Sequence, residues 1–471
     1  MGRIVDSKLV RGLNLTGATA IVVGTVIGTG VFLKARVMTC NVESASTVLI
    51  VWVACGLLTL AGTLTYAELS AMMPHAGGEY VFIRDAYGPR MGYIYGWTQF
   101  AIAYAASGAA KGAAFAVFLN VLLHGGLETN YFTVHLLGHA FPVGHMQMVA
   151  LTLVTVITIL NCLAVSVSGA ITSFLTILKV ALVLAVGIGI FMLADGNWMH
   201  FAMSNGGGLC EGVAPGARGG LGGFGAAMLG ALWAYDGWSN LTIMAGEVKN
   251  PKRNLPLALI GGMILIMFLY ALINAAYFYV LSPTEIAGIP ASSSVASLAV
   301  EHVLGPLAAS VMAVGLLIST LGSCYNTVLT AARIPYAMAE DGLLFRRLAN
   351  VSRRTHVPVN AIIVQWVWIC ILTLSGSFDT LTDYAMFAAY IFYGLATASV
   401  FIFRRKMPDA ERSYRTWGYP VVPVLFLIVT AFLLANTIWT APLQSLTGVG
   451  LILAGLPLYW YFTRFHSRKA A

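Results

Sequence analysis

Apolar residues fill long, continuous stretches of the chain that are separated by short polar segments. Each stretch is long enough for a helix of about 20 residues to cross a hydrocarbon core roughly 30 Å thick. The stretches do not alternate in the two-residue pattern of a membrane β-barrel. The pattern therefore predicts an all-α integral membrane protein with 12 transmembrane helices. Their expected bounds are about 14–36, 47–73, 91–123, 147–165, 168–194, 221–246, 257–281, 308–338, 358–376, 381–403, 420–440 and 446–463.

Composition excludes a water-soluble domain. Hydrophobic residues make up 59% of the 471 residues and charged residues only 9%, against roughly a quarter charged in an ordinary soluble domain. The mean hydropathy is +0.83. The charged first residues lead into a span too polar at its centre for a signal peptide, so the N-terminus is expected to be that of the mature protein.

The basic residues predict the orientation in the membrane. An even number of spans places both termini on one side, and basic residues are retained on the cytoplasmic side. They cluster in the N-terminus, in the loops after even-numbered spans and in the C-terminus, whereas the opposite loops hold only Lys34, Arg36 and Arg218. We therefore expect a multi-pass protein of the inner (plasma) membrane with both termini cytoplasmic. The net charge of +8 is attributed to this bias and not to a nucleic-acid partner.

The cysteines indicate neither a metal site nor a disulfide framework. They form no CxxC pair and lack a neighbouring histidine at ligand spacing. We expect most of the cysteines to be small apolar core residues, and we expect no cofactor or metal. The six cysteines are Cys40, Cys55, Cys162, Cys210, Cys324 and Cys370.

Two spans contain residues that a simple membrane helix avoids. The first span reads IVVGTVIGTGVF, with Gly24, Gly28 and Gly30 within seven residues, and the sixth places Asp236 beside Gly237. Each glycine costs a helix about 1 kcal/mol relative to alanine, and a charge at bilayer centre costs at least about 2.5 kcal/mol. Close packing of small residues is the alternative explanation for the glycines of the first span.

These two irregular positions lie five spans apart. Because five is an odd number, two successive repeats of five spans would have opposite orientations in the membrane. Broken first helices of such repeats meet at the midplane and expose backbone groups to substrate. Unpaired N–H groups attract a carboxylate and unpaired C=O groups attract an ammonium, so the two breaks together suit an α-amino acid. The N–H groups are expected from Gly28, Thr29 and Gly30. The C=O groups are expected from Trp233, Ala234 and Asp236.

Several segments resemble the amino acid, polyamine and organocation (APC) superfamily, and within it the L-type amino acid transporter (LAT) family, bacterial type. They are GTVIGTGVF, YAELSAMMPHAGGEYVFIRDAYGP, LWAYDGW, GEVKNPKRNLPLAL and RTWGYPVVP. The resemblance implies a LeuT-like 5+5 inverted repeat with broken helices 1 and 6. The transport core would be residues 1–403, with helices 1–5 at about 14–194 and helices 6–10 at about 221–403, and residues 404–471 would add helices 11 and 12 with a cytoplasmic tail.

The resemblance also implies roles for individual residues. Val26 would precede the carboxylate site, and Trp233 would close over bound substrate from the outside, although an ordinary core tryptophan is the alternative. Ser107 and Ala103 would line the side-chain pocket, with plain helix packing as the alternative. LAT proteins of animals bind a heavy chain through a cysteine between spans three and four; residues 124–146 contain none. No disulfide-linked heavy chain is therefore expected, and the oligomeric state stays open.

Lys179 is a lone charge deep in the fifth predicted span. By the resemblance, a lysine here stands where sodium-coupled relatives bind a sodium ion, near the first break and the hydroxyls of Ser319 and Ser323. A snorkelling lysine and a proton carrier with a shifted pKa are the alternatives. Asp236 is compatible with cationic or neutral substrates, neutral being favoured. Lys111, in the outer part of span three, has no role from the sequence.

These observations favour a sodium-independent amino acid transporter, an exchanger of small or neutral amino acids working by alternating access. A proton-coupled symporter or a carrier of cationic amino acids or polyamines is the alternative. An enzyme is not expected, because no HExxH or GxSxG motif occurs. A channel is disfavoured because no ring of charges or filter-like repeat is visible. The preferred amino acid is not determined by the sequence.

Overall fold

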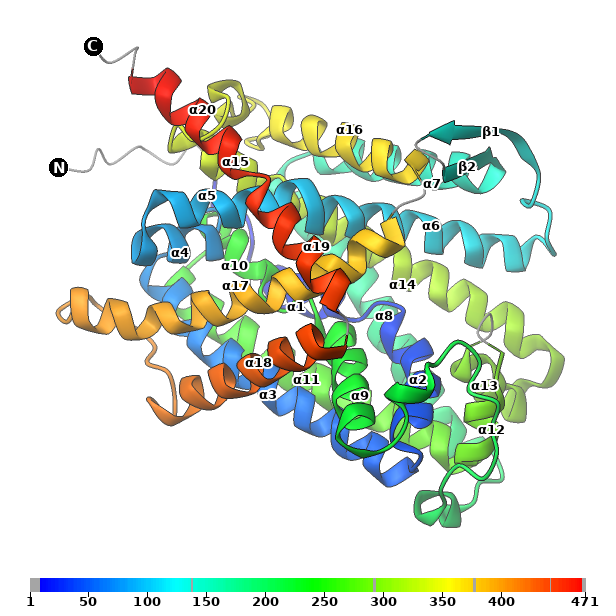
Figure 1. Cartoon of the computed structure of the whole chain (residues 1–471). Helices are drawn as coiled ribbons and strands as arrows, with labels where there is room; N and C mark the ends of the chain where they lie inside the picture. Colours follow the sequence, from blue (N-terminus) through cyan, green and yellow to red (C-terminus); the bar gives the residue numbers. More distant parts are fainter. Residues whose placement is uncertain (1–8, 137–138, 291–293, 376–377, 441, 468–471) are drawn as a thin grey trace.

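The computed structural model describes residues 9–136, 139–290, 294–375, 378–440 and 442–467, and most of these residues are helical (Figure 1). Up to the middle of the chain the helices are α1 (Leu15–Val26), α2 (Gly30–Val42), α3 (Ala45–Met72), α4 (Glu79–Tyr87), α5 (Pro89–Thr98), α6 (Tyr104–Leu122), α7 (His145–Asn161), α8 (Val165–Leu193), α9 (Gly220–Tyr235) and α10 (Asn240–Ile243). The later helices are α11 (Pro251–Val280), α12 (Pro283–Gly288), α13 (Val295–Leu304), α14 (Ala308–Ala331), α15 (Arg333–Glu340), α16 (Val359–Ser375), α17 (Phe378–Lys406), α18 (Val421–Thr440), α19 (Pro442–Leu453) and α20 (Leu456–Ser467).

Within the described residues, eight helices are long and apolar enough to cross a membrane, and two shorter apolar helices lie at His145–Asn161 and Val359–Leu374. Side chains such as Phe174 and Ile177 of α8 are more than 60% exposed. Large apolar side chains turned outward along a helix suit a hydrocarbon environment and not water. The fold is therefore a helical bundle with an apolar outer surface. The predicted sixth span is not among the eight, because it is divided into two shorter helices, α9 and α10.

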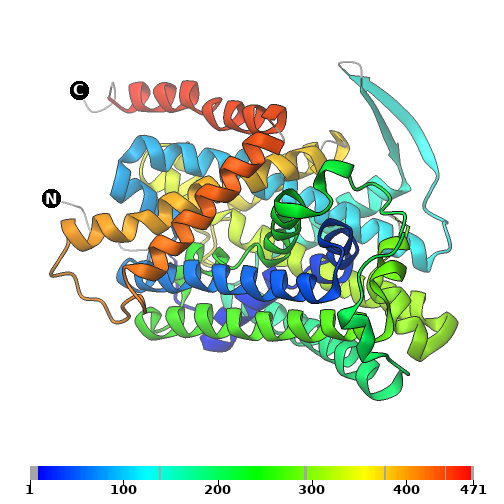
Figure 2. The same ribbon diagram turned by 60° about the horizontal axis from the view of Figure 1, so that its bottom comes forward.

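Two elements outside the bundle were not predicted. Strands β1 (Asn130–Leu136) and β2 (His139–Gly144) pair antiparallel after α6 and project from the bundle as a hairpin (Figures 1 and 2). At the same end of the molecule lie α2, α12 and α13, whereas α4, α15 and α20 lie at the other end (Figures 1 and 2). The chain between α8 and α9 is an irregular segment with short 3-10 turns.

The cysteine pattern did not indicate the disulfide that two of the six cysteines form. Cys40 of α2 forms a disulfide with Cys210 in the segment between α8 and α9, 170 residues later. Sequence spacing does not reveal a pair so far apart, because only the packing of the loop over α2 brings the two together. Cys55, Cys162, Cys324 and Cys370 are free.

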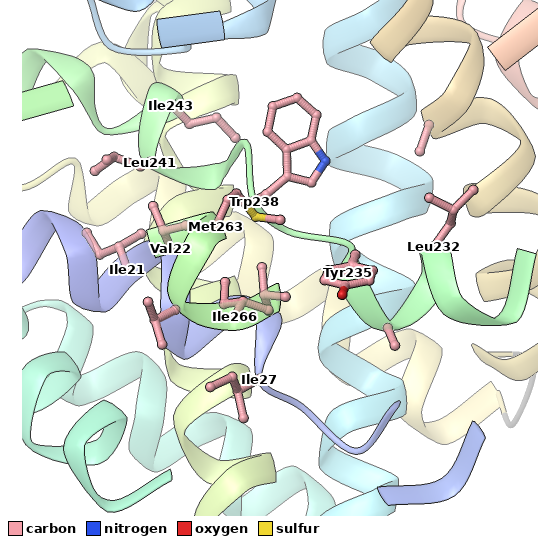
Figure 3. Packing of buried hydrophobic residues seen from close by; sticks show 14 of the residues in the cluster. Ile21, Val22, Ile27, Leu232, Tyr235, Trp238, Leu241, Ile243, Met263 and Ile266 are labelled. Carbon is pink, nitrogen blue, oxygen red and sulfur yellow. The ribbon is translucent and has the colours of Figure 1, made fainter. Parts of the chain in front are cut away.

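The bundle interior surrounds the two interrupted spans. Helix α1 packs against α8, α11 and α14, and α2 packs against α9. Buried apolar side chains from both interrupted spans fill the space around them, among them Ile21 and Ile27 from the first, and Leu232, Tyr235 and Trp238 from the sixth (Figure 3). This packing leaves a cavity beside the two breaks, which is the candidate site.

Candidate substrate site between two broken helices

The first predicted span is interrupted at Gly28. Helix α1 ends at Val26, Ile27 is extended with ψ of 90°, and α2 begins at Gly30. Within the described residues, no acceptor pairs with the backbone N–H groups of Gly28, Thr29 and Gly30. Three successive unpaired N–H groups at the start of a helix form an anion-binding arrangement.

The C=O groups at the same break face cations and hydroxyls. The Lys179 Nζ donates to the carbonyl oxygens of Gly24 and Ile27, each at 2.7 Å. The Ser319 hydroxyl lies 3.3 Å from the Ile27 oxygen and 3.1 Å from the Gly28 oxygen. The side chain of Lys179 is completely buried. The last turn of α1, whose carbonyls lack helical partners, is thus held by the amino group of Lys179.

Ser323 behaves differently from Ser319. Its hydroxyl bonds back to the Ser319 and Thr320 carbonyls of its own helix, each at 3.1 Å. It contributes to the cavity wall but makes no hydrogen bond to the break within the described residues. Of the two predicted hydroxyls, only that of Ser319 reaches the first break.

The sixth predicted span is interrupted at Asp236. Helix α9 ends at Tyr235, Asp236 is extended, and the chain resumes as α10 at Asn240. Gly237 has a φ of +94°, and a Cβ there would come within 2.6 Å of the Thr25 side chain. Only glycine suits both this conformation and this close contact.

The two breaks pack directly against each other. A Cβ on Gly30 would lie 2.7 Å from the Cβ of Ala234 and 2.9 Å from its Cα. The Tyr270 hydroxyl of α11 bridges the carbonyl oxygens of Val26, at 2.9 Å, and Ala234, at 3.0 Å. In this conformation the Ala234 carbonyl, expected to face an ammonium, therefore already has a partner.

The three glycines of the first span have different surroundings. A Cβ on Gly24 would lie 2.2 Å from the Thr176 hydroxyl, so Gly24 allows α1 to approach α8 closely. A Cβ on Gly28 would meet nothing nearer than the Val26 oxygen at 3.9 Å. Close packing between helices therefore accounts for a glycine at Gly24 and contributes to the need for one at Gly30. Gly28 borders open space instead.

That open space is a cavity of about 270 Å³. All nine residues expected to contact substrate line it: Val26, Gly28, Thr29, Gly30, Ala103, Ser107, Trp233, Ala234 and Asp236. Lys179 and Ser319 lie behind its wall and are not part of the lining. The structure thus separates a group of cavity-lining residues from a group that stabilises the break from behind.

The cavity wall contains residues to which sequence reasoning gave no role. Lys111 of α6 lines it and donates to the Thr327 hydroxyl at 2.5 Å. Tyr393 donates to the Asp236 carboxylate at 2.7 Å, and Tyr104 donates to the Asn240 side-chain oxygen at 2.7 Å. Span three contains a π-helical segment, Gln99–Ala103, whose two end residues also line the cavity. A π-bulge of this kind is frequent at functional sites.

Glu79, the first residue of α4, also lines the cavity although it lies between predicted spans two and three. Its side chain is 1% exposed, and its Oε2 has no hydrogen-bond partner within the described residues. Burial raises the pKa of Glu79 to about 7, with Asp236 raising it further and the hydroxyls of Ser239 and Tyr95 opposing the rise. The GGEY motif marks this position in the sequence, but a glutamate in a polar loop gives no sign that it reaches the cavity.

Two further acidic residues lie in ion pairs away from the cavity. Glu247 binds the buried Arg333 through both carboxylate oxygens, at 2.8 and 3.1 Å. Glu68 binds Arg404 at 2.8 Å and accepts from the Thr416 backbone N–H at 2.7 Å. Among the described residues, no group of three or more histidine, cysteine or acidic side chains is placed to hold a metal ion.

Comparisons with known proteins agree over almost the whole chain. A family model described as amino acid permease matches residues 13–462. The b(0,+)-type amino acid transporter 1 of Mus musculus is 31% identical over 98% of this chain and 89% of its own length. The serine/threonine exchanger SteT of Bacillus subtilis (strain 168) is 31% identical over 97% of each chain. The cystine/glutamate transporter of Homo sapiens is 28% identical over 97% of this chain and 86% of its own.

Proposed function

Since the chain belongs to the amino acid permease family, we propose that it exchanges small neutral amino acids across a membrane without using sodium. The observation that carries the proposal is the first break, where the N–H groups of Gly28, Thr29 and Gly30 have no partner and border the cavity. They suit the carboxylate of an amino acid. The carbonyls of Trp233, Ala234 and Asp236 at the sixth break are proposed for its ammonium group. Trp233 and Ala234 already accept from the Asp236 N–H and the Tyr270 hydroxyl, so the Asp236 carbonyl is the most available of the three.

The architecture supports alternating access. We propose 12 membrane spans, with residues 1–403 forming the two inverted repeats and residues 404–471 the last two spans. The two interrupted spans, α1–α2 and α9–α10, contact each other beside the cavity. Both termini are proposed to be cytoplasmic in the plasma membrane. No disulfide-linked heavy chain is proposed.

Lys179 is the basis for sodium independence. Its ammonium contacts the Gly24 and Ile27 carbonyls, where a sodium ion would need oxygen ligands. A fixed charge at this place holds the end of α1 as an ion would, but it does not dissociate with substrate. A proton-coupled cycle, with Lys179 losing its proton, is the alternative, as is a carrier of cationic amino acids or polyamines.

Reconstituted vesicles test the proposed function. Uptake of a labelled amino acid should require an amino acid inside the vesicle, and it should ignore sodium and protonophores. Preloading with each of the twenty amino acids in turn ranks the substrates. Uptake into empty vesicles driven by an inward proton gradient would establish the symport alternative, and stimulation by sodium would contradict the role of Lys179.

Trp233 is expected to act as an outer gate. It lines the cavity, and the Lys34 ammonium lies 4.6 Å from its ring centre. Trp233→Ala should reduce the maximal exchange rate about tenfold while changing the dissociation constant little, because a gate governs closure more than affinity. The two quantities should be measured on the same preparation. A large loss of affinity at unchanged turnover would make Trp233 a pocket wall.

Glu79 should make exchange depend on pH. Its pKa is about 7 in this structure, against 4.5 for an ordinary glutamate. Relative to a conformation in which the Glu79 carboxyl is hydrated and titrates normally, this conformation loses stability as the pH rises from about 4.5 to about 7. Below this window both conformations bind the proton, and above it neither does, so the difference in stability no longer changes. The titratable groups around Glu79 are Asp236, Tyr66, Tyr95, Tyr104 and Tyr393.

Because this conformation contains the substrate cavity, we expect exchange to slow as the pH rises from about 4.5 to about 7 and to level off above 7. Glu79→Gln, which is always neutral, should flatten this part of the pH profile. The exposed Glu301 of α13 provides the control, since Glu301→Gln should leave the profile unchanged. A profile that is identical in wild type and Glu79→Gln would assign the pH response elsewhere.

A further inference from the structure

Lys111 is a basic residue in the cavity wall. Binding of the carboxylate and ammonium groups of an α-amino acid at the two breaks does not require it. It stands on α6, and the Thr327 hydroxyl is its hydrogen-bond partner among the described residues. No carboxylate of the described residues lies within 4.0 Å of its ammonium. An ammonium has three N–H donors, so two remain for a group that enters the cavity.

The wall around Lys111 is polar. Thr320, Ser323 and Thr327 of α14 line the cavity at spacings of three and four residues, which places them on one face of that helix. Ser107 of α6 lies one helical turn before Lys111 and lines the same cavity. Hydroxyl groups and an ammonium therefore share this part of the wall, which is distinct from the two backbone breaks.

An apolar substrate side chain would fit this wall poorly. It would remove water from the Lys111 ammonium without giving an acceptor in return, and unpaired polar groups discriminate strongly against ligands that leave them so. A cationic side chain would be repelled by the same ammonium. A side chain with an oxygen atom supplies the missing acceptor.

We propose that Lys111, positioned by Thr327, is a specificity-determining residue that binds an oxygen atom on the side chain of the substrate. The preferred substrates are then neutral amino acids with a hydroxyl or carboxamide side chain. This inference rests on the proposed function and narrows its substrate class. The substrate head group stays at the two breaks, and the side chain extends toward α6 and α14.

Matched pairs of competitors test the inference in vesicles that contain the full chain. In two pairs a hydroxyl replaces a methyl group: serine with 2-aminobutyrate, and threonine with valine. In the third pair, asparagine with leucine, a carboxamide replaces a branched alkyl group of similar size. In the wild type the oxygen-bearing member should inhibit exchange at about tenfold lower concentration. In Lys111→Met, which keeps the length but not the charge, the ratio should fall to about one.

Two further variants distinguish a specific role from a structural one. Thr327→Val removes the partner that positions the ammonium and should lower the ratio less than Lys111→Met does. It also tests the inference if Lys111→Met does not insert. Lys252→Met removes an exposed lysine paired with Glu411 and should leave every ratio unchanged.

The outcomes separate this inference from the proposed function. Amino acid exchange that persists in Lys111→Met with an unchanged ratio overturns the role of Lys111 alone. An equal loss of affinity for all competitors in Lys111→Met also overturns this role, because it indicates that Lys111 only supports the structure. A wild-type protein that exchanges no amino acid overturns the proposed function itself.

Discussion

Gly28→Val should abolish amino acid binding without unfolding the protein, whereas Gly30→Val should abolish binding and also lower thermal stability. A side chain on Gly28 enters the cavity, where the nearest atom is 3.9 Å from its Cβ. A side chain on Gly30 collides with Ala234 and separates the two breaks. Each hydrogen bond lost to a carboxylate costs about 1.5–3 kcal/mol, or about 10–100-fold in affinity, so the loss of several such bonds should leave no detectable binding.

Equilibrium binding and melting temperature should be measured on the same purified proteins. Methyl esters provide an independent check on the wild type, because an ester lacks the charge that the three N–H groups attract. Esters should bind far more weakly than the free amino acids. Wild-type affinity in Gly28→Val, or equal affinity for ester and acid, would show that the substrate carboxylate does not bind at this break.

Lys179→Ala should reduce exchange by about 100-fold while the protein still inserts into the membrane. The ammonium makes two hydrogen bonds to backbone carbonyls in a fully buried position. Removal of a charged donor that leaves buried acceptors unpaired costs about 3 kcal/mol, which is about two decades in rate. Lys179→Arg should not restore exchange, because the guanidinium is planar and larger than the point charge it replaces.

Thr176 supplies the matched control for Lys179. It lies on the same helix α8 and donates to the Ala20 carbonyl of α1 at 3.0 Å, so it is a neutral contact between the same two helices. Thr176→Val should lower exchange much less than Lys179→Ala. Equal losses in the two variants would show that α8 acts through packing alone and that the charge has no special role.

Much of the helical order follows from the sequence because lipid requires long apolar runs with all backbone groups paired internally. The breaks could also be located, since glycines and an aspartate in mid-span are costly unless they have a role. The cavity lining at Gly28 and Asp236 followed from those positions. The pattern of apolar and polar residues therefore indicates the positions at which a helix is interrupted.

The remaining parts depend on packing between distant elements. Glu79 belongs to a polar loop, where a charge is ordinary, and only the packing of α4 beside α10 brings it to the cavity. Tyr270 is one aromatic residue among many in an apolar span, yet its hydroxyl bridges both breaks. The β1–β2 hairpin lies in a segment with no membrane requirement, so the apolar pattern gives no signal for it.

The disulfide between Cys40 and Cys210 provides a chemical marker of sidedness. Such bonds persist in oxidising compartments and are rare in the cytosol, so this end of the bundle should face outward. On intact cells, an impermeant maleimide should label the protein only after an impermeant reductant has been applied. The double variant Cys40→Ala, Cys210→Ala should stay unlabelled. The covalent link also obliges the outer half of the first span to move together with the loop before α9, so a rearrangement of α2 should carry that loop with it.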